Sequence, residues 1–146
     1  MGLIEAIDGR RTYLDANIFI YLFEAPAAYQ ATLGALVHAL DAGMLDAVTS
    51  ELSLAEVLVK PMREAPAYVP IYRQYLHSRP HFDVLPVTRT LLIEAARLRA
   101  TTRLKLPDAI HAATALEARC GVLLTNDGRL KRLPGLDILQ LADAGA

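Results

Sequence analysis

The stretch Arg11-Thr12-Tyr13-Leu14-Asp15-Ala16-Asn17-Ile18-Phe19-Ile20-Tyr21 determines the fold that we expect for this chain. It begins polar, becomes hydrophobic, and places one carboxylate between two apolar runs. Tyr13 and Leu14 predict the end of a short buried strand, and Asn17 predicts the N-cap of the helix that follows. Asp15 would then lie at the carboxyl end of a strand, where open α/β sheets bind ligands. A simple turn or capping role for Asp15 fits this stretch equally well.

Composition limits the class of protein. The 146 residues predict one domain, 1–146, that is large enough for a full core. Hydrophobic residues make up 53% and mean hydropathy is +0.27, which a parallel sheet covered on both faces would explain. The net charge of −1 gives no general affinity for nucleic acid, so any such contact must be local.

Nothing in the sequence predicts export or membrane insertion. No apolar run approaches the roughly 18 residues that a membrane span needs, and the first residues carry acids where a signal peptide would be basic. The single Cys120 excludes an internal disulfide and a zinc–thiolate cluster, and is expected to be a small buried side chain. These features predict a location in the reducing cytoplasm.

Apolar patterning alternates strands with helices along the whole chain. The expected strands are 11–15, 45–49, 82–87, 121–125 and 136–141. The expected helices are 18–23, 29–42, 51–60, 67–78, 89–100 and one beginning at 107, with N-caps at Ser50 and Thr88 and a stop at Pro61. Residues 1–10 and the tail from 142 are expected to be weakly docked or frayed. This alternation predicts an α/β fold with a parallel sheet between two helical layers.

Two further acids and a histidine lie on the expected helices. Glu56 shares a helix face with apolar neighbours, where an unpaired charge is costly, although a solvent-facing position is equally consistent with the spacing. Asp108 follows Pro107 in a first helical turn, where a negative charge is favoured, so simple capping also explains it. His111 lies one turn further on and is more readily explained as a packed histidine than as a ligand.

The acids are expected to converge. If the first and fourth strands are neighbours, Asp15 and Asp127 open onto one crevice that Asp108 and Glu56 can face. Four carboxylates packed together repel unless a cation neutralises them, and oxygen ligands of this kind favour Mg²⁺ or Mn²⁺. Such a cation can activate water for attack on a phosphodiester. The basic side chains that follow could contact phosphate or form a solvated face: Arg129, Lys131 and Arg132.

Four motifs together resemble a known family. They are Leu14-Asp15-Ala16-Asn17, Ser50-Glu51-Leu52-Ser53-Leu54-Ala55-Glu56, Pro107-Asp108-Ala109-Ile110-His111-Ala112-Ala113-Thr114-Ala115 and Leu124-Thr125-Asn126-Asp127. In this order and over essentially the whole chain, they resemble a PIN domain, most closely the VapC-type toxins of toxin–antitoxin pairs. The resemblance implies a three-layer fold with a five-stranded parallel sheet of order 3-2-1-4-5, and a metal-dependent endoribonuclease.

The resemblance also implies roles for single residues. By position, Asp15 and Asp108 match metal ligands, Glu56 and Asp127 complete the acidic set, and Asn17 with Thr125 would orient ligands or substrate. No family role transfers to His111, Tyr72 or Arg129. Arg129 is expected to orient substrate or ligand only because it follows Asp127 closely in the chain. A second helix face carries Tyr68, Tyr72 and Tyr75. That tyrosine face favours packing or a subunit interface over base stacking. The implied partners are RNA, a cognate antitoxin that inserts an arginine among the acids, and a second copy of the chain.

Three other functions share parts of this pattern, and one feature separates each of them from the nuclease. A phosphatase of the haloacid-dehalogenase type needs a second aspartate two residues after Asp15, where Asn17 stands. A response-regulator receiver needs an aspartate after the third strand, where Pro86 and Val87 follow. A catalytically degenerate PIN domain that only binds RNA or protein has no reason to hold Mg²⁺ or Mn²⁺, so metal binding separates it from the nuclease.

Overall fold

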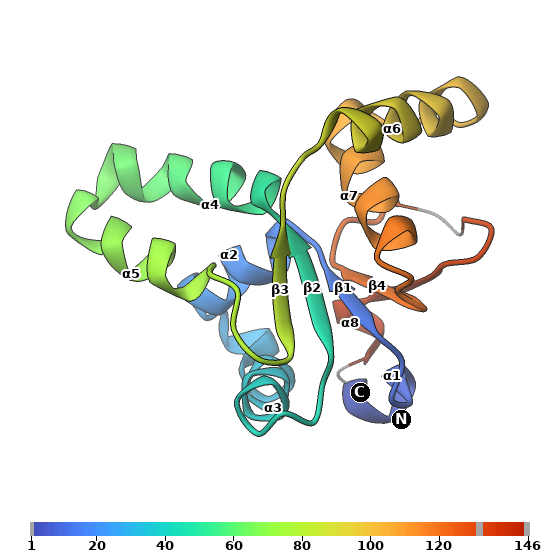
Figure 1. Ribbon diagram of the computed structural model, residues 1–146. Coiled ribbons are helices and arrows are strands. Elements are labelled where there is room, and N and C mark those ends of the chain that lie inside the picture. The colour runs from blue at the N-terminus through green and yellow to red at the C-terminus, as the bar shows by residue number, and fades with distance from the viewer. Residues whose placement is uncertain (1, 131–132, 145–146) are drawn as a thin grey trace.

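The computed structural model describes residues 2–130 and 133–144 (Figure 1). Five strands form one parallel sheet of order β3-β2-β1-β4-β5. The strands are β1 (Thr12–Leu14), β2 (Ala47–Ser50), β3 (Phe82–Leu85), β4 (Val122–Thr125) and β5 (Asp137–Gln140). The helices are α1 (Leu3–Ile7), α2 (Ala16–Glu24), α3 (Gln30–Asp41), α4 (Glu51–Glu64), α5 (Val69–Tyr75), α6 (Arg89–Thr101), α7 (Leu106–Glu117) and α8 (Leu141–Ala144). The predicted fold class and strand order are therefore confirmed.

The central strand β1 is buried on both of its faces. All three of its residues are buried, because β2 and β4 flank it and helices cover both faces. Tyr13 packs with the cluster under α7, and the next residue, Leu14, packs with the cluster under α2 and α3. This alternation follows from the two-residue side-chain period of a strand.

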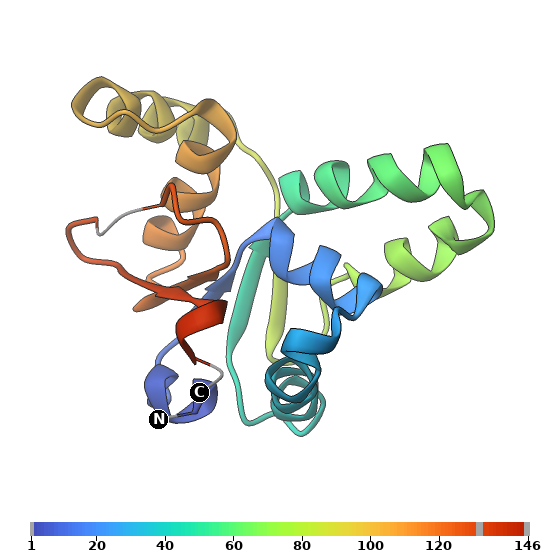
Figure 2. The same ribbon diagram turned by 180° about the vertical axis from the view of Figure 1, so that it is seen from behind.

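The helices form two layers around the sheet. The core clusters place α1, α2 and α3 on one face and α6 with α7 on the other. Figures 1 and 2 show this from opposite sides, and also show α4 and α5 lying side by side as an arm that extends away from the sheet. No helix in the described part of the chain has the length and apolar character to cross a bilayer.

Local capping signals mostly behave as the sequence predicts. Ser50 and Thr88 accept hydrogen bonds from backbone N–H groups in the first turns of α4 and α6. The expected N-cap at Asn17 is wrong: Asp15 caps α2 and accepts from the N–H of Ala16. The helix begins two residues earlier because Asp15 already has the extended backbone that an N-cap requires. Cys120 is buried as expected, and burial raises the pKa of its thiol to about 12.

Three segments form helix where the sequence predicts a frayed terminus or the end of a helix. The lead-in forms α1, because Leu3 and Ile7 share one face and are both buried against the core. The last strand is followed by α8, in which Leu141 is fully buried. The stop at Pro61 is also wrong: α4 continues to Glu64, Pro61 is itself buried, and its carbonyl accepts from the N–H of Ala65.

The expected tyrosine face is mainly a packing surface. Tyr72 stacks on Phe23 with ring centroids 3.8 Å apart, and Tyr75 meets Phe19 edge to face at 6.3 Å. Tyr68 differs, because 57% of its surface is exposed. Two of the three tyrosines therefore fix α5 onto α2 and the core.

We expect Phe19→Ala to destabilise the fold by about 3–5 kcal/mol, because it would open a cavity in the core. Phe19 is completely buried and packs on Phe82 as well as on α5. Urea unfolding followed by circular dichroism measures this change. Leu92→Ala, at a side chain that is 44% exposed, is the matched control and should change stability by less than about 1 kcal/mol. Similar losses in both variants would contradict this account of the core.

Candidate active site

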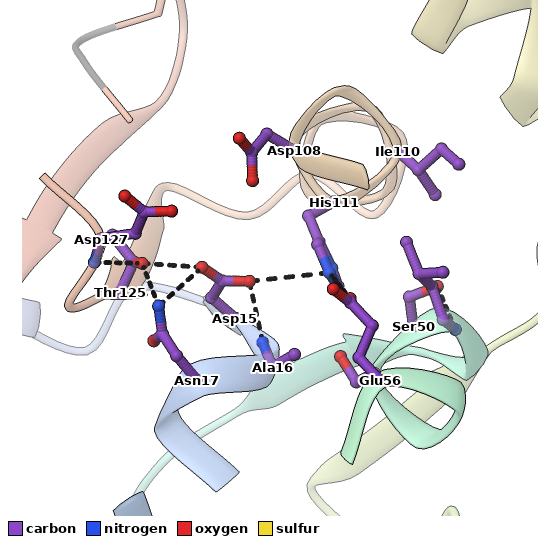
Figure 3. A network of polar contacts seen from close by, with 12 residues as sticks. Asp15, Ala16, Asn17, Ser50, Glu56, Asp108, Ile110, His111, Thr125 and Asp127 are labelled. Carbon is purple, nitrogen blue, oxygen red and sulfur yellow. Dashed lines mark hydrogen bonds and ion pairs between the residues drawn. The ribbon is translucent and has the colours of Figure 1, made fainter. Parts of the chain in front are cut away.

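Asp15 is the centre of the candidate site. It follows β1 directly, is only 6% exposed, and is bonded by three donors. The N–H of Ala16 donates to Oδ1 at 2.8 Å, while Thr125 Oγ1 and Asn17 Nδ2 lie 2.7 and 3.3 Å from Oδ2 (Figure 3). The carboxylate is thus held in place by both its own helix and the neighbouring strand β4.

Thr125 connects the ends of the two central strands. Its hydroxyl donates to Asp15, and the same oxygen accepts from Asn17 Nδ2 at 3.1 Å and from the N–H of Asp127 at 3.0 Å. Asn17 Oδ1 in turn accepts from the N–H of Asn126 at 3.1 Å. These bonds fix the turn after β4 against the start of α2, so Asn17 and Thr125 position the acids that flank them.

Asp127 is paired with a cation from its own turn. Arg129 Nε lies 2.9 Å from both carboxylate oxygens, and the guanidinium also bonds through Nη2. These hydrogen bonds lower the pKa of Asp127 and keep it ionised. Lys131 and Arg132, which the sequence analysis grouped with Arg129, lie outside the described residues.

Asp108 is in a less favourable environment. It lies in the first turn of α7 and is 9% exposed, and no side chain or backbone group in the two described ranges donates a hydrogen bond to its carboxylate. Arg129 Nη2 lies 4.0 Å from Asp108 Oδ2. Burial, aided by the charges of Asp127 and Asp15, raises the pKa of Asp108 despite the opposing effect of Arg129.

Glu56 reaches the site from α4 through His111. The imidazole Nε2 lies 2.6 Å from Glu56 Oε1 and 3.6 Å from Asp15 Oδ1. On its other side, Nδ1 lies 2.6 Å from the hydroxyl of Tyr13, whose pKa is raised well above its usual value by burial. The Glu56 side chain is 36% exposed, whereas that of His111 is 1% exposed.

The structure therefore gathers the four predicted acids at one edge of the sheet, the acidic cluster of Asp15, Glu56, Asp108 and Asp127 (Figure 3). The expected adjacency of the first and fourth strands is the cause. The place of His111 beside these acids was not predicted from the sequence. Its position one turn after Asp108 was the available signal, but spacing alone cannot show that Glu56 comes within bonding distance.

The acidic cluster supplies ligands suited to a hard divalent cation. Its donors are carboxylate oxygens, and the buried Asp108 carboxylate has no hydrogen bond that would offset its charge among the described residues. Across residues 2–130 and 133–144, no three His, Cys, Asp or Glu side chains already surround one metal position. The contacts of Arg129 with Asp127 and of His111 with Glu56 occupy two of the four acids.

Fold and site together define an α/β protein with a 3-2-1-4-5 parallel sheet and an acidic cluster at the carboxyl ends of its central strands. The profile of the PIN domain family matches residues 12–136, which include all four acids. The chain belongs to the PIN domain family.

Solved structures give a consistent result. A toxin–antitoxin complex from Klebsiella pneumoniae contains a chain that is 26% identical, with a TM-score of 0.65 over 86% of this chain and 94% of that one. The fold is also similar to a chain of VapBC2 from Rickettsia felis bound to a promoter DNA fragment. That match has 19% identity and a TM-score of 0.66, and covers 88% of this chain and 97% of the other. No curated protein sequence matches significantly.

Proposed function

We propose that this protein is a metal-dependent endoribonuclease, the VapC-type toxin of a toxin–antitoxin pair. The observation that carries the proposal is the acidic cluster, with Asp15 fixed by three hydrogen bonds and Asp108 buried without one in the described chain. A protein that used these residues only for folding would gain little from placing buried carboxylates side by side, because their repulsion destabilises the fold. The PIN family match and the toxin–antitoxin neighbours support this proposal.

The proposed cofactor is Mg²⁺ or Mn²⁺. Asp15 and Asp108 would hold the cation, with Glu56 and Asp127 completing its surroundings directly or through water. When bound, such a cation activates water and stabilises charge on a phosphodiester. The chain's own contribution is orientation: Thr125 and Asn17 hold the Asp15 carboxylate, and burial at the start of α7 holds Asp108 close to it.

Arg129 is the proposed contact for the RNA phosphate. Its side chain is 59% exposed, and its Nη2 lies 4.0 Å from Asp108 and also bonds Asp127. A phosphate entering the cluster would compete for the same donors, since guanidinium binds phosphate and carboxylate in the same bidentate manner. Asn17 and Thr125 would orient the substrate indirectly, because their hydrogen bonds hold the turn after β4 and its Asp127 in a fixed position.

The proposed protein partner is an antitoxin. The similar Klebsiella chain is part of a toxin–antitoxin complex, and the α4–α5 arm exposes apolar side chains of the kind found at interfaces: Val59, Met62, Tyr68 and Ile71. An antitoxin arginine could pair with the acidic cluster, as Arg129 pairs with Asp127. We also propose that the protein acts as a homodimer in the cytoplasm.

RNA cleavage by the purified protein tests the proposal. We expect bulk cellular RNA to be cut with Mg²⁺ or Mn²⁺, and cutting to stop when EDTA removes the metal. Isothermal titration with Mn²⁺ alone, followed by EDTA, checks metal binding independently of activity. Cutting that persists in EDTA would contradict the proposal, and a folded protein that binds no metal and cuts no RNA would favour the degenerate binding module.

A further inference from the structure

We propose that His111 is a positioning residue that holds the Glu56 carboxylate in the acidic cluster through a hydrogen-bond relay that starts at Tyr13. This inference rests on the proposed metal-dependent function, because it assigns His111 a role in the same site. The relay joins three elements: Tyr13 comes from β1, His111 from α7 and Glu56 from α4.

The geometry of the relay is tight and largely removed from solvent. Both links, Tyr13 Oη to His111 Nδ1 and His111 Nε2 to Glu56 Oε1, measure 2.6 Å. Tyr13 is completely buried and His111 is 1% exposed. Only the Glu56 end of the relay, with a side chain that is 36% exposed, opens toward solvent. Two buried groups therefore fix the position of one that would otherwise be mobile.

The hydrogen bond to Glu56 also fixes which nitrogen of the imidazole carries a hydrogen. An ionised carboxylate can only accept, so His111 Nε2 must carry a hydrogen and donate to Glu56. On the other side of the ring, the hydroxyl of Tyr13 lies 2.6 Å from Nδ1 of His111. With the hydrogen on Nε2, Nδ1 can accept from this hydroxyl, so the relay requires the Nε2–H tautomer.

His111 and Arg129 hold two acids of the cluster in different ways. Arg129 pairs with Asp127 from an exposed turn, whereas His111 bonds Glu56 from a buried position on α7. Nε2 of His111 also lies 3.6 Å from Asp15 Oδ1, beyond a hydrogen bond, so it stands between two carboxylates that repel each other. His111 thereby places the Glu56 carboxylate near Asp15. Partners of this kind that support ligating groups typically contribute about 10–100-fold to metal affinity or activity.

Mn²⁺ titration of the metal-free full chain and two His111 variants tests the relay. His111→Leu fills the space but has no donor, and we expect Mn²⁺ binding to weaken about 10–100-fold. His111→Gln places an amide N–H near the position of Nε2 and should recover most of the lost Mn²⁺ affinity. His38→Leu, at an exposed histidine of α3, is the matched control and should bind as the wild type does.

A double-mutant cycle shows whether His111 acts through Glu56. Glu56→Gln should weaken Mn²⁺ binding, and adding His111→Leu should weaken it little further, because both changes remove the same contribution. Independent, additive losses would overturn the inference, as would a folded His111→Leu protein that binds Mn²⁺ normally. Urea unfolding of each variant shows whether it is folded.

Ring ¹⁵N spectra of the metal-free protein give a readout that needs neither metal nor RNA. We expect His111 in the Nε2–H tautomer, and Tyr13→Phe to weaken that preference while retaining the fold. A dominant Nδ1–H tautomer would overturn the relay even if His111→Leu fails to fold. If the wild type binds no Mn²⁺ and cuts no RNA, the proposed function fails, and the tautomer still decides the assignment of His111.

Discussion

Asp15→Asn is expected to reduce metal-dependent RNA cleavage by about 10³-fold or more while leaving the protein folded. A metal ligand contributes several kcal/mol of transition-state stabilisation, and each ~1.4 kcal/mol corresponds to a factor of ten in rate. The amide oxygen of asparagine can take the place of Oδ1 and accept from the N–H of Ala16, so the cap of α2 should survive. The amide NH₂ then takes the place of Oδ2, where the hydroxyl of Thr125 can turn to accept from it.

The matched control is Asp41→Asn, which removes a carboxylate at the exposed end of α3. Initial rates on one RNA substrate at saturating Mn²⁺, with circular dichroism of both variants, give the comparison. Undiminished cleavage by Asp15→Asn would exclude Asp15 as a metal ligand and return it to the capping role that the sequence alone also allowed.

Asp108→Asn is expected to stabilise the metal-free protein even though it removes activity. The pKa of Asp108 is raised in the folded state, mainly by burial, so its ionised form destabilises the fold at neutral pH. Asparagine carries no charge and removes this cost. Metal should stabilise the wild type by binding the folded state, and the variant should lose most of that gain along with about 10³-fold of the cleavage rate.

The sign of the pH dependence follows from the same shift. As pH falls through the raised pKa of Asp108, the folded state takes up a proton before the unfolded state does. The free-energy cost of burying the ionised carboxylate then disappears. The stability advantage of Asp108→Asn should therefore be present at neutral pH and shrink in acid. Thermal unfolding at a series of pH values, with and without Mn²⁺, measures both effects. A variant less stable than the metal-free wild type at neutral pH would contradict this account.

Much of the fold could be predicted because each strand and cap has a local cause. The apolar pair Tyr13–Leu14, the caps at Ser50 and Thr88, and the alternation of strands with helices depend on neighbours in sequence. The errors arose where tertiary packing overrode local signals. Burial of Leu3 and Ile7 orders α1, and burial of Pro61 allows α4 to continue past a residue that usually ends a helix.

The candidate site was predictable in its residues but not in its contacts. The four acids could be chosen from motif order, and their meeting followed from the adjacency of β1 and β4. The pairing of Asp127 with Arg129 follows from a two-residue separation, so it was within reach of the sequence. The hydrogen bond between Glu56 and His111 could not be predicted from the sequence. It depends on how α4 packs against α7, and the spacing of residues along either helix does not determine that packing.

The hydrogen bond from Thr125 to Asp15 spans 110 positions of the chain, and it has a consequence for synthesis. A nascent chain that has left the ribosome only as far as β3 contains Asp15 and Glu56 but neither Asp108 nor Asp127. It also lacks β4, the strand that completes the pairing of β1 on one side. The acidic cluster can therefore form only when translation is almost finished, so truncated products carry Asp15 without the residues that orient it.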